Sequence, residues 1–284
     1  MSDNSKALTA ELLPFEQTNF HPEYRKYFQT KRHNFFRAIS EFSELWECFQ
    51  TLADIWQRDI EDTQHLNDPA QMLPSLIFRY AHARFLAAIE LGFPCCVGDA
   101  YGSIRGGIEA VAQAHKIHRE PQLATVWTTK GKGKEEDERY RQAFEHNKKL
   151  SLFPAQHGLE KLYECWKWSS ELGPHSNVVA VGKGFEETIA DGKQTWAFHH
   201  FETEPRKLAV FLFGLLAAST EMEQSFYKCF EQRLQLDTLL ADKRQDFRQK
   251  VKQQGEYLRN KYDLTPNTFV SELDQKRRAG AKSG

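Results

Sequence analysis

The sequence predicts a mainly α-helical protein, a multi-helix bundle that carries one small antiparallel β-hairpin around residues 185–201. Apolar residues recur at steps of three and four along most of the chain, and Gly and Pro stand at the ends of these runs, which is typical of helices. The period changes to β-type runs after Val178, where Asp191-Gly192 favours a hairpin turn, and helical spacing returns after Pro205.

Length and composition allow one large helical domain or two small ones. With 284 residues, 40% of them hydrophobic and 13% aromatic, the chain can bury a sizeable core. We expect a single α-helical domain over residues 22–263. A flexible lead-in, interrupted by Pro14 and Pro22, covers residues 1–21, and a disordered basic tail covers 264–284.

Charge and cysteine usage exclude several classes of protein. The 38 Lys and Arg nearly balance the 39 Asp and Glu, so only a local basic patch could attract nucleic acid or an anionic membrane. The apolar run Leu208–Ala218 is about half a membrane span, and no secretory signal precedes it, so we expect a cytoplasmic protein without membrane contact. An odd number of cysteines without CxxC spacing indicates reduced thiols: Cys48, Cys95, Cys96, Cys165 and Cys229.

The first half of the chain predicts three helices. One long helix, either continuous or broken, is expected between Tyr24 and Gln64. The next, Pro74–Leu91, is apolar nearly all round and should lie in the centre of the bundle. The third, Gly98–His118, carries small residues on one flank, where another helix can approach closely.

The second half begins with a charged, glycine-containing stretch at Thr128–Glu138, which we predict to be a mobile surface loop. Helices are then expected over Glu136–Leu150 and Ala155–Leu172. A regular apolar stripe after Pro205 predicts a long core helix, whereas Leu239–Tyr262 has only a thin apolar seam and should lie outside or meet a partner.

Polar residues within the central helix are the first candidates for a site. Arg79, His82 and Glu90 share one face at helical spacing, and a buried charge needs a partner. They either line a polar pocket or include a structural ion pair. We favour the pair and predict that Arg79 is buried and bound to Glu90 or Glu109.

The run YGSIRGGIEA gives a second group of candidates. Arg105 and Glu109 can pair across one turn, and Gln113 and Lys116 continue their face, which favours a solvated stripe. The alternative is a ligand site, because a guanidinium suits phosphate or carboxylate. The ligand-binding candidates are therefore Arg105, Glu109 and Glu90.

Histidines supply the remaining candidates. His115 and His118 stand three residues apart, but no Glu-x-x-His motif accompanies them, so we expect neither a metal nor a cofactor. His175, in SSELGPHSN, either stabilises a turn or acts as a general acid or base beside the central helix.

The order of these parts, a buried helix with Arg79, then IRGGIE and SELGPHSN, resembles uncharacterised bacterial all-α proteins near the HEPN-like helical bundles, over residues 75–180. The resemblance implies a bacterial stress or defence pathway. Nucleases of that group carry Arg and His separated by four to six residues. Three pairs here have that spacing: Arg58 with His65, and Arg139 and Arg141 with His146. The stop at Gly173-Pro174 places His175 outside a helix.

Three hypotheses about function follow. The favoured one is a non-catalytic interaction or regulatory module that binds itself, as a homo-oligomer, or another protein. The second is a metal-independent RNase or other phosphodiester-acting enzyme, with Arg141 and His146, or Arg79, His82 and His175, providing anion binding and proton transfer. The third is a small-ligand-binding protein whose pocket is lined by Tyr80, Trp166 and Trp168.

Overall fold

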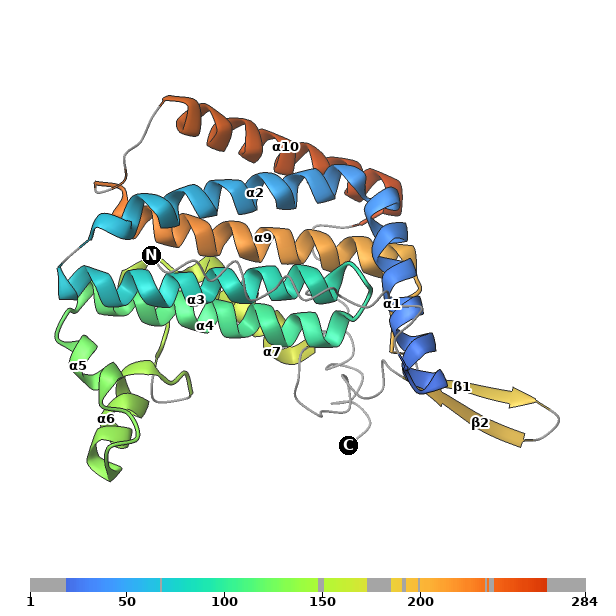
Figure 1. Ribbon diagram of the computed structural model, residues 1–284, viewed down its shortest axis with the longest axis horizontal. Helices are drawn as coiled ribbons and strands as arrows, with labels where there is room; N and C mark the ends of the chain where they lie inside the picture. The colour runs from blue at the N-terminus through green and yellow to red at the C-terminus, as the bar shows by residue number, and fades with distance from the viewer. Residues whose placement is uncertain are drawn as a thin grey trace, which may run out of the picture.

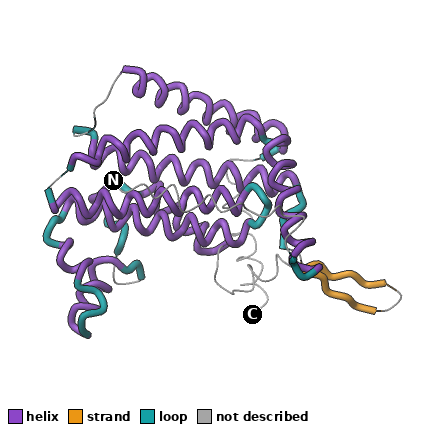
Figure 2. Tube along the Cα trace, in the orientation of Figure 1, coloured by secondary structure: helices purple, strands orange, loops and turns teal. Residues whose placement is uncertain are grey.

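The computed structural model describes the chain over residues 19–66, 68–147, 151–172, 185–190, 193–198, 200–232, 234 and 238–264. These residues form a mainly helical bundle, which confirms the predicted fold class at that level (Figures 1 and 2). The long helices lie roughly side by side, α1 crosses one end of the bundle, and α5 and α6 lie at the other end. Five sequence predictions fall wholly or largely outside these residues: the lead-in 1–21, the turn Asp191-Gly192, His175, Val178–Val181 and the tail 264–284.

The long helix expected between Tyr24 and Gln64 is in fact two helices, α1 (Pro22–Glu41) and α2 (Ser43–Asp62), followed by the short 3₁₀ turn η3 (Thr63–His65). The break is at Phe42, whose backbone leaves the helical region with φ −120° and ψ 42°. Its side chain is buried in the core, and its N–H still bonds the carbonyl of Ala38. Burial of Phe42 therefore accompanies the change of direction that takes α1 across the end of the bundle.

The helices α3 (Pro69–Gly92) and α4 (Val97–Arg119) pack closely against each other. Asp68 caps α3 by accepting the N–H of Ala70 at 3.0 Å, so the helix begins five residues before Pro74. A Cβ added at Gly107 would lie 2.6 Å from Met222 Cε and 3.4 Å from the carbonyl oxygen of Ala81. The absent side chain at Gly107 therefore permits the close approach of α4 to α3 and to α9.

The next segment contains α5 (Leu123–Thr128), α6 (Lys134–Phe144), the 3₁₀ turn η4 (Ala155–His157) and α7 (Glu160–Leu172). The loop predicted at Thr128–Glu138 is shorter than expected, because α6 begins at Lys134. The Asp137 carboxylate accepts the N–H of Gly131 at 2.7 Å and holds this turn. The helix predicted to reach Leu150 ends at Phe144.

The strands β1 (Phe185–Ala190) and β2 (Lys193–Phe198) pair antiparallel, from Phe185 opposite Phe198 to Ala190 opposite Lys193. They are the only strands among the described residues and extend from the bundle beside α1 (Figure 1). The chain then returns to helices with α9 (Pro205–Phe230) and α10 (Thr238–Tyr262).

The middle of the bundle is occupied by α9, which contacts α2, α3, α4, α7 and α10. Its face from Leu208 to Phe230 is buried, as the sequence predicts. The prediction that α3 is central is wrong, because Met72, Leu76, Tyr80 and Leu86 are exposed. In the part of the chain that the structure describes, no helix is long and apolar enough to cross a membrane.

Candidate functional site

Arg79 lies on α3 and is half-buried, not enclosed as predicted. Its Nη2 donates to the backbone carbonyl of Ile60 at 3.3 Å, and its Nε has no hydrogen-bond partner among the described residues. The predicted ion pair is wrong: Glu90 is exposed, and Glu109 binds other side chains. One side of α3 faces solvent, so the charge of Arg79 does not need a buried carboxylate.

His82, one turn further along α3, points into the core. Its ring packs against Trp56 at 5.2 Å and Phe85 at 5.9 Å between centroids. Burial lowers the pKa of His82 to about 4, so the imidazole is neutral at pH 7. Among the described contacts, none joins His82 to Arg79 or Glu90 in a shared polar pocket.

Arg105 and Glu109 form the predicted pair on α4, with 3.1 Å between Nε and Oε1. The same oxygen accepts the indole N–H of Trp166 from α7 at 2.9 Å. The Arg105 guanidinium also lies over the Trp166 ring, 5.5 Å from its centroid. These contacts connect α4 to α7 and give Glu109 a structural role.

The polar face of α4 is not a solvated stripe, because α5, α6 and the segment after α6 contact it. Gln113 accepts from Trp127 Nε1 at 3.0 Å and donates to the hydroxyl of Tyr140 at 3.3 Å. Lys116 Nζ donates to the carbonyl of Ala143 at 2.6 Å, where it caps the end of α6. The sequence shows the polar spacing of this face, but not which helices cover it.

His146 follows α6 and lies among three aromatic rings. Its ring is 5.0 Å from both Tyr163 and Trp166, and 5.7 Å from Phe153, between centroids. Desolvation lowers the pKa of His146, and its Nδ1 has no hydrogen-bond partner among the described residues. Arg141, by contrast, is exposed and pairs with Glu138. No described contact joins Arg141 to His146, so the geometry gives the RNase hypothesis no support.

The remaining histidine and aromatic candidates also contact different partners and form no common site. The ring of His115 packs on His157 at 5.4 Å, whereas His118 packs on Phe230 at 5.6 Å. Across the described residues, no group of three or more His, Cys, Asp or Glu is placed to hold a metal ion. Tyr80 is 55% exposed on α3, away from Trp168, which packs on Tyr101. The pocket predicted between Tyr80, Trp166 and Trp168 is therefore absent from this part of the chain.

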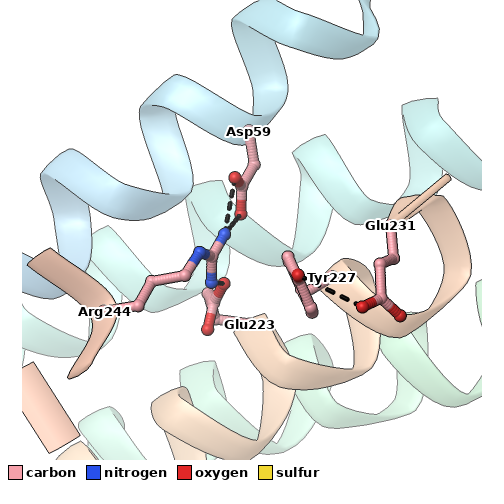
Figure 3. Close-up of polar contacts among 5 residues, drawn as sticks. All are labelled: Asp59, Glu223, Tyr227, Glu231 and Arg244. Carbon is pink, nitrogen blue, oxygen red and sulfur yellow. Dashed lines mark hydrogen bonds and ion pairs between the residues drawn. The ribbon is translucent and has the colours of Figure 1, made fainter. Parts of the chain in front are cut away.

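A buried ionic cluster, which sequence reasoning missed, joins α2, α9 and α10 (Figure 3). Both oxygens of Asp59 accept from Arg244 Nη2, at 2.6 and 2.5 Å, and Arg244 Nη1 donates to Glu223. The side chains are 0%, 8% and 5% exposed for Asp59, Arg244 and Glu223. Tyr227 covers the guanidinium at 4.4 Å from its ring centroid and donates its O–H to Glu231 at 3.3 Å.

The electrostatics of this cluster follow from two carboxylates sharing one cation. Burial and then the nearby Glu223 carboxylate raise the pKa of Asp59 to about 7, although Arg244 opposes the shift. Because the three side chains are almost fully enclosed, a substrate cannot reach them without movement of α10. The cluster is best explained as the attachment of α10 to the bundle.

Four exposed apolar side chains lie along α3. Met72, Leu76, Tyr80 and Leu86 are 46%, 51%, 55% and 45% exposed, and Ala83 lies among them. At 100° per residue these five side chains, with Glu90, occupy one side of the helix. We call this set of six residues the α3 face. Adjacent exposed apolar side chains of this kind mark interaction surfaces more often than isolated ones do.

The fold and these surfaces define a helical bundle with an exposed apolar helix face and a buried ionic cluster. No protein-family model, curated protein or solved structure matches the chain. A functional assignment therefore depends on the geometry of this molecule alone.

Proposed function

We propose that the protein is a non-catalytic helical interaction module that forms a homodimer through the α3 face. The observation that supports this proposal is the exposure of Met72, Leu76, Tyr80 and Leu86 along one side of a 24-residue helix. Such a helix is about 36 Å long and can align with a second copy over its whole length. Burying these side chains against each other would remove their apolar surface from water.

The α3 face is self-complementary in an antiparallel pair. Around a two-fold axis, opposing residues of two antiparallel helices have numbers that add to a constant. With the axis beside Ala81, Leu76 lies opposite Leu86 of the second copy. In the same register, the small Ala83 lies opposite Arg79 of the second copy. A small residue opposite a long one allows the two helices to approach closely.

Charge supports the same register. Glu90 is exposed near the carboxyl end of α3, and this register places it opposite Met72, in the first turn of the second copy's helix. Carboxylates are favoured near helix N-termini, where backbone N–H groups leave partial positive charge. The two α3 dipoles also run in opposite directions, which is favourable. A second copy of the chain is therefore the occupant that we propose.

Sedimentation velocity over about 1 µM to 1 mM tests the dimer, since this range covers weak to moderate affinities. We expect a shift from the 33.0 kDa monomer to twice that mass. Leu76→Lys and Leu86→Glu should each weaken association, and the double variant should restore it, because the new charges face each other across the axis. Leu239→Glu, at a 77% exposed leucine on α10, is the matched control.

Two outcomes would contradict the proposal. One is a monomer throughout the concentration range. The other is a dimer that tolerates both single variants, which would place the interface elsewhere. Both leucines are about half exposed, so each single variant should unfold within about 0.5 kcal/mol of wild type. That measurement separates loss of association from loss of the fold.

A further inference from the structure

The helix α1 carries a row of exposed side chains that its packing in the bundle does not use. Tyr24, Phe28, Arg32 and Phe36 stand at four-residue steps and are all exposed, with Tyr24 64%, Phe28 41% and Phe36 58% accessible. Successive members are about 6 Å apart along the axis. Only Asn34 and Ala38 of the helix are fully buried. The row therefore places one cation, Arg32, among three aromatic rings on an open surface.

The same helix is basic in a chain that is not. Residues 22–41 contain five Lys and Arg and two Glu, a formal charge of +3, whereas the whole chain has −1. Lys26, His33 and Arg37 are exposed on another side of the helix, and Glu41 lies at its far end. The helix α10 is basic as well, with seven Lys and Arg and three Asp and Glu. What distinguishes α1, at the end of the bundle (Figure 1), is that its charge accompanies a row of exposed aromatic side chains.

An open groove of about 710 Å³ adjoins the first half of the row. Its aromatic wall includes Tyr27, whose ring stacks on Phe201 at 5.4 Å and meets Phe28 at 5.6 Å between centroids. Lys26 and Thr30 supply hydrogen-bond donors, and Glu23 is the acidic residue of the lining. A planar ring of a ligand could enter this groove and stack on aromatic side chains while a charged group remains outside.

We propose that α1 and this groove bind single-stranded nucleic acid. Unpaired bases stack on aromatic side chains whatever their sequence, and Lys and Arg between the rings neutralise the phosphates. The row of Tyr24, Phe28, Arg32 and Phe36 provides three aromatic rings, with the cation of Arg32 between Phe28 and Phe36. This surface lies on a different helix from the α3 face, and the inference is independent of dimer formation.

An anionic membrane fits the surface less well. A helix that lies in a membrane interface separates an apolar face from a basic one. On α1 Arg32 lies within the aromatic row, between Phe28 and Phe36, while Phe35 and Ile39 pack against the core. The groove is also concave, which suits an inserted ring and not a lipid surface.

Fluorescence anisotropy with the full chain and labelled oligo(U) and oligo(dT) of about 15 nucleotides tests the proposal. We expect affinity for both strands to fall between about 50 and 200 mM salt. Phe36→Ala should weaken binding about fivefold with an unchanged salt slope. Arg32→Ala should weaken binding and reduce the slope of log K against log salt by about 0.7. Arg248→Ala, at an exposed arginine on α10, should change neither.

Three results would overturn the proposal: no binding of either strand at about 50 mM salt, equal binding of a duplex of the same length, or Phe36→Ala and Arg32→Ala both matching wild type. Co-sedimentation with phosphatidylcholine vesicles, with and without phosphatidylserine, tests binding to an anionic membrane. Preferential binding to the phosphatidylserine vesicles would favour the membrane instead. Thermal melting of each variant verifies its fold, because both side chains are exposed and their loss should not unfold the helix.

Discussion

Arg244 is the residue whose chemical environment differs most from its sequence context. It lies in α10, a helix with many charged residues, yet its guanidinium is enclosed by Asp59 of α2 and Glu223 of α9. Such a pair contributes little net stability compared with apolar packing, but removing one partner leaves an uncompensated buried charge. Arg244 therefore determines where α10 attaches to the bundle.

Arg244→Met should lower the free energy of unfolding by about 3 kcal/mol or more, because two buried carboxylates would lose the cation that they share. Urea unfolding measures the change. Lys243→Met is the control, since Lys243 pairs with Asp54 at 3.2 Å on the surface and should contribute less than about 1 kcal/mol. Equal effects of the two variants would show that the buried cluster does not hold α10.

At the scale of elements, the contact between α3, α4 and α9 depends on Gly107. Its missing Cβ leaves space that Met222 of α9 and the backbone of Ala81 on α3 occupy. Gly98, near the start of the same helix, has no atom within 4 Å of the corresponding position. Comparing Gly107 with Gly98 therefore separates the effect of close helix packing from the effect of a glycine on the stability of its own helix.

Gly107→Leu should destabilise the protein by about 1–3 kcal/mol, because the new side chain cannot fit without displacing α3 or α9. Gly98→Leu should be neutral or slightly stabilising, since leucine has the higher helix propensity. Thermal unfolding compares the two. Adding Met222→Ala to Gly107→Leu should recover part of the loss, and strictly additive effects would indicate that the two side chains do not compete for space.

At the scale of the whole molecule, the buried cluster makes stability depend on pH. Folding raises the pKa of Asp59 from its usual 3.8 to about 7, so between these values the folded chain binds more protons than the unfolded chain. The contribution of Asp59 is therefore fully present below pH 3.8 and is lost as pH rises through 7. His82 has the opposite effect, because burial lowers its pKa to about 4 and its contribution is lost as pH falls.

Asp59→Asn should remove the part of this dependence that comes from the carboxyl group. As pH rises from about 4 to 7, the wild type should lose stability relative to the variant, because the Asp59 carboxyl group loses its proton and the amide has none to lose. Chemical unfolding at several pH values measures this difference. Asp54→Asn, at an exposed position of the same helix, should give a difference that varies much less. A flat difference for Asp59→Asn would show that Asp59 is charged throughout.

Local periodicity determined the helical class of the chain and placed α4, α9 and α10 within a few residues of their observed bounds. Such signals depend on neighbours three and four residues apart, so a single sequence carries them. The covered faces were decided by tertiary packing: the apolar α3 is open to solvent on one side, and the polar face of α4 is covered by α5 and α6. Asp59 and Arg244 meet across 185 residues, and no local pattern in the sequence records which distant segments share a buried charge.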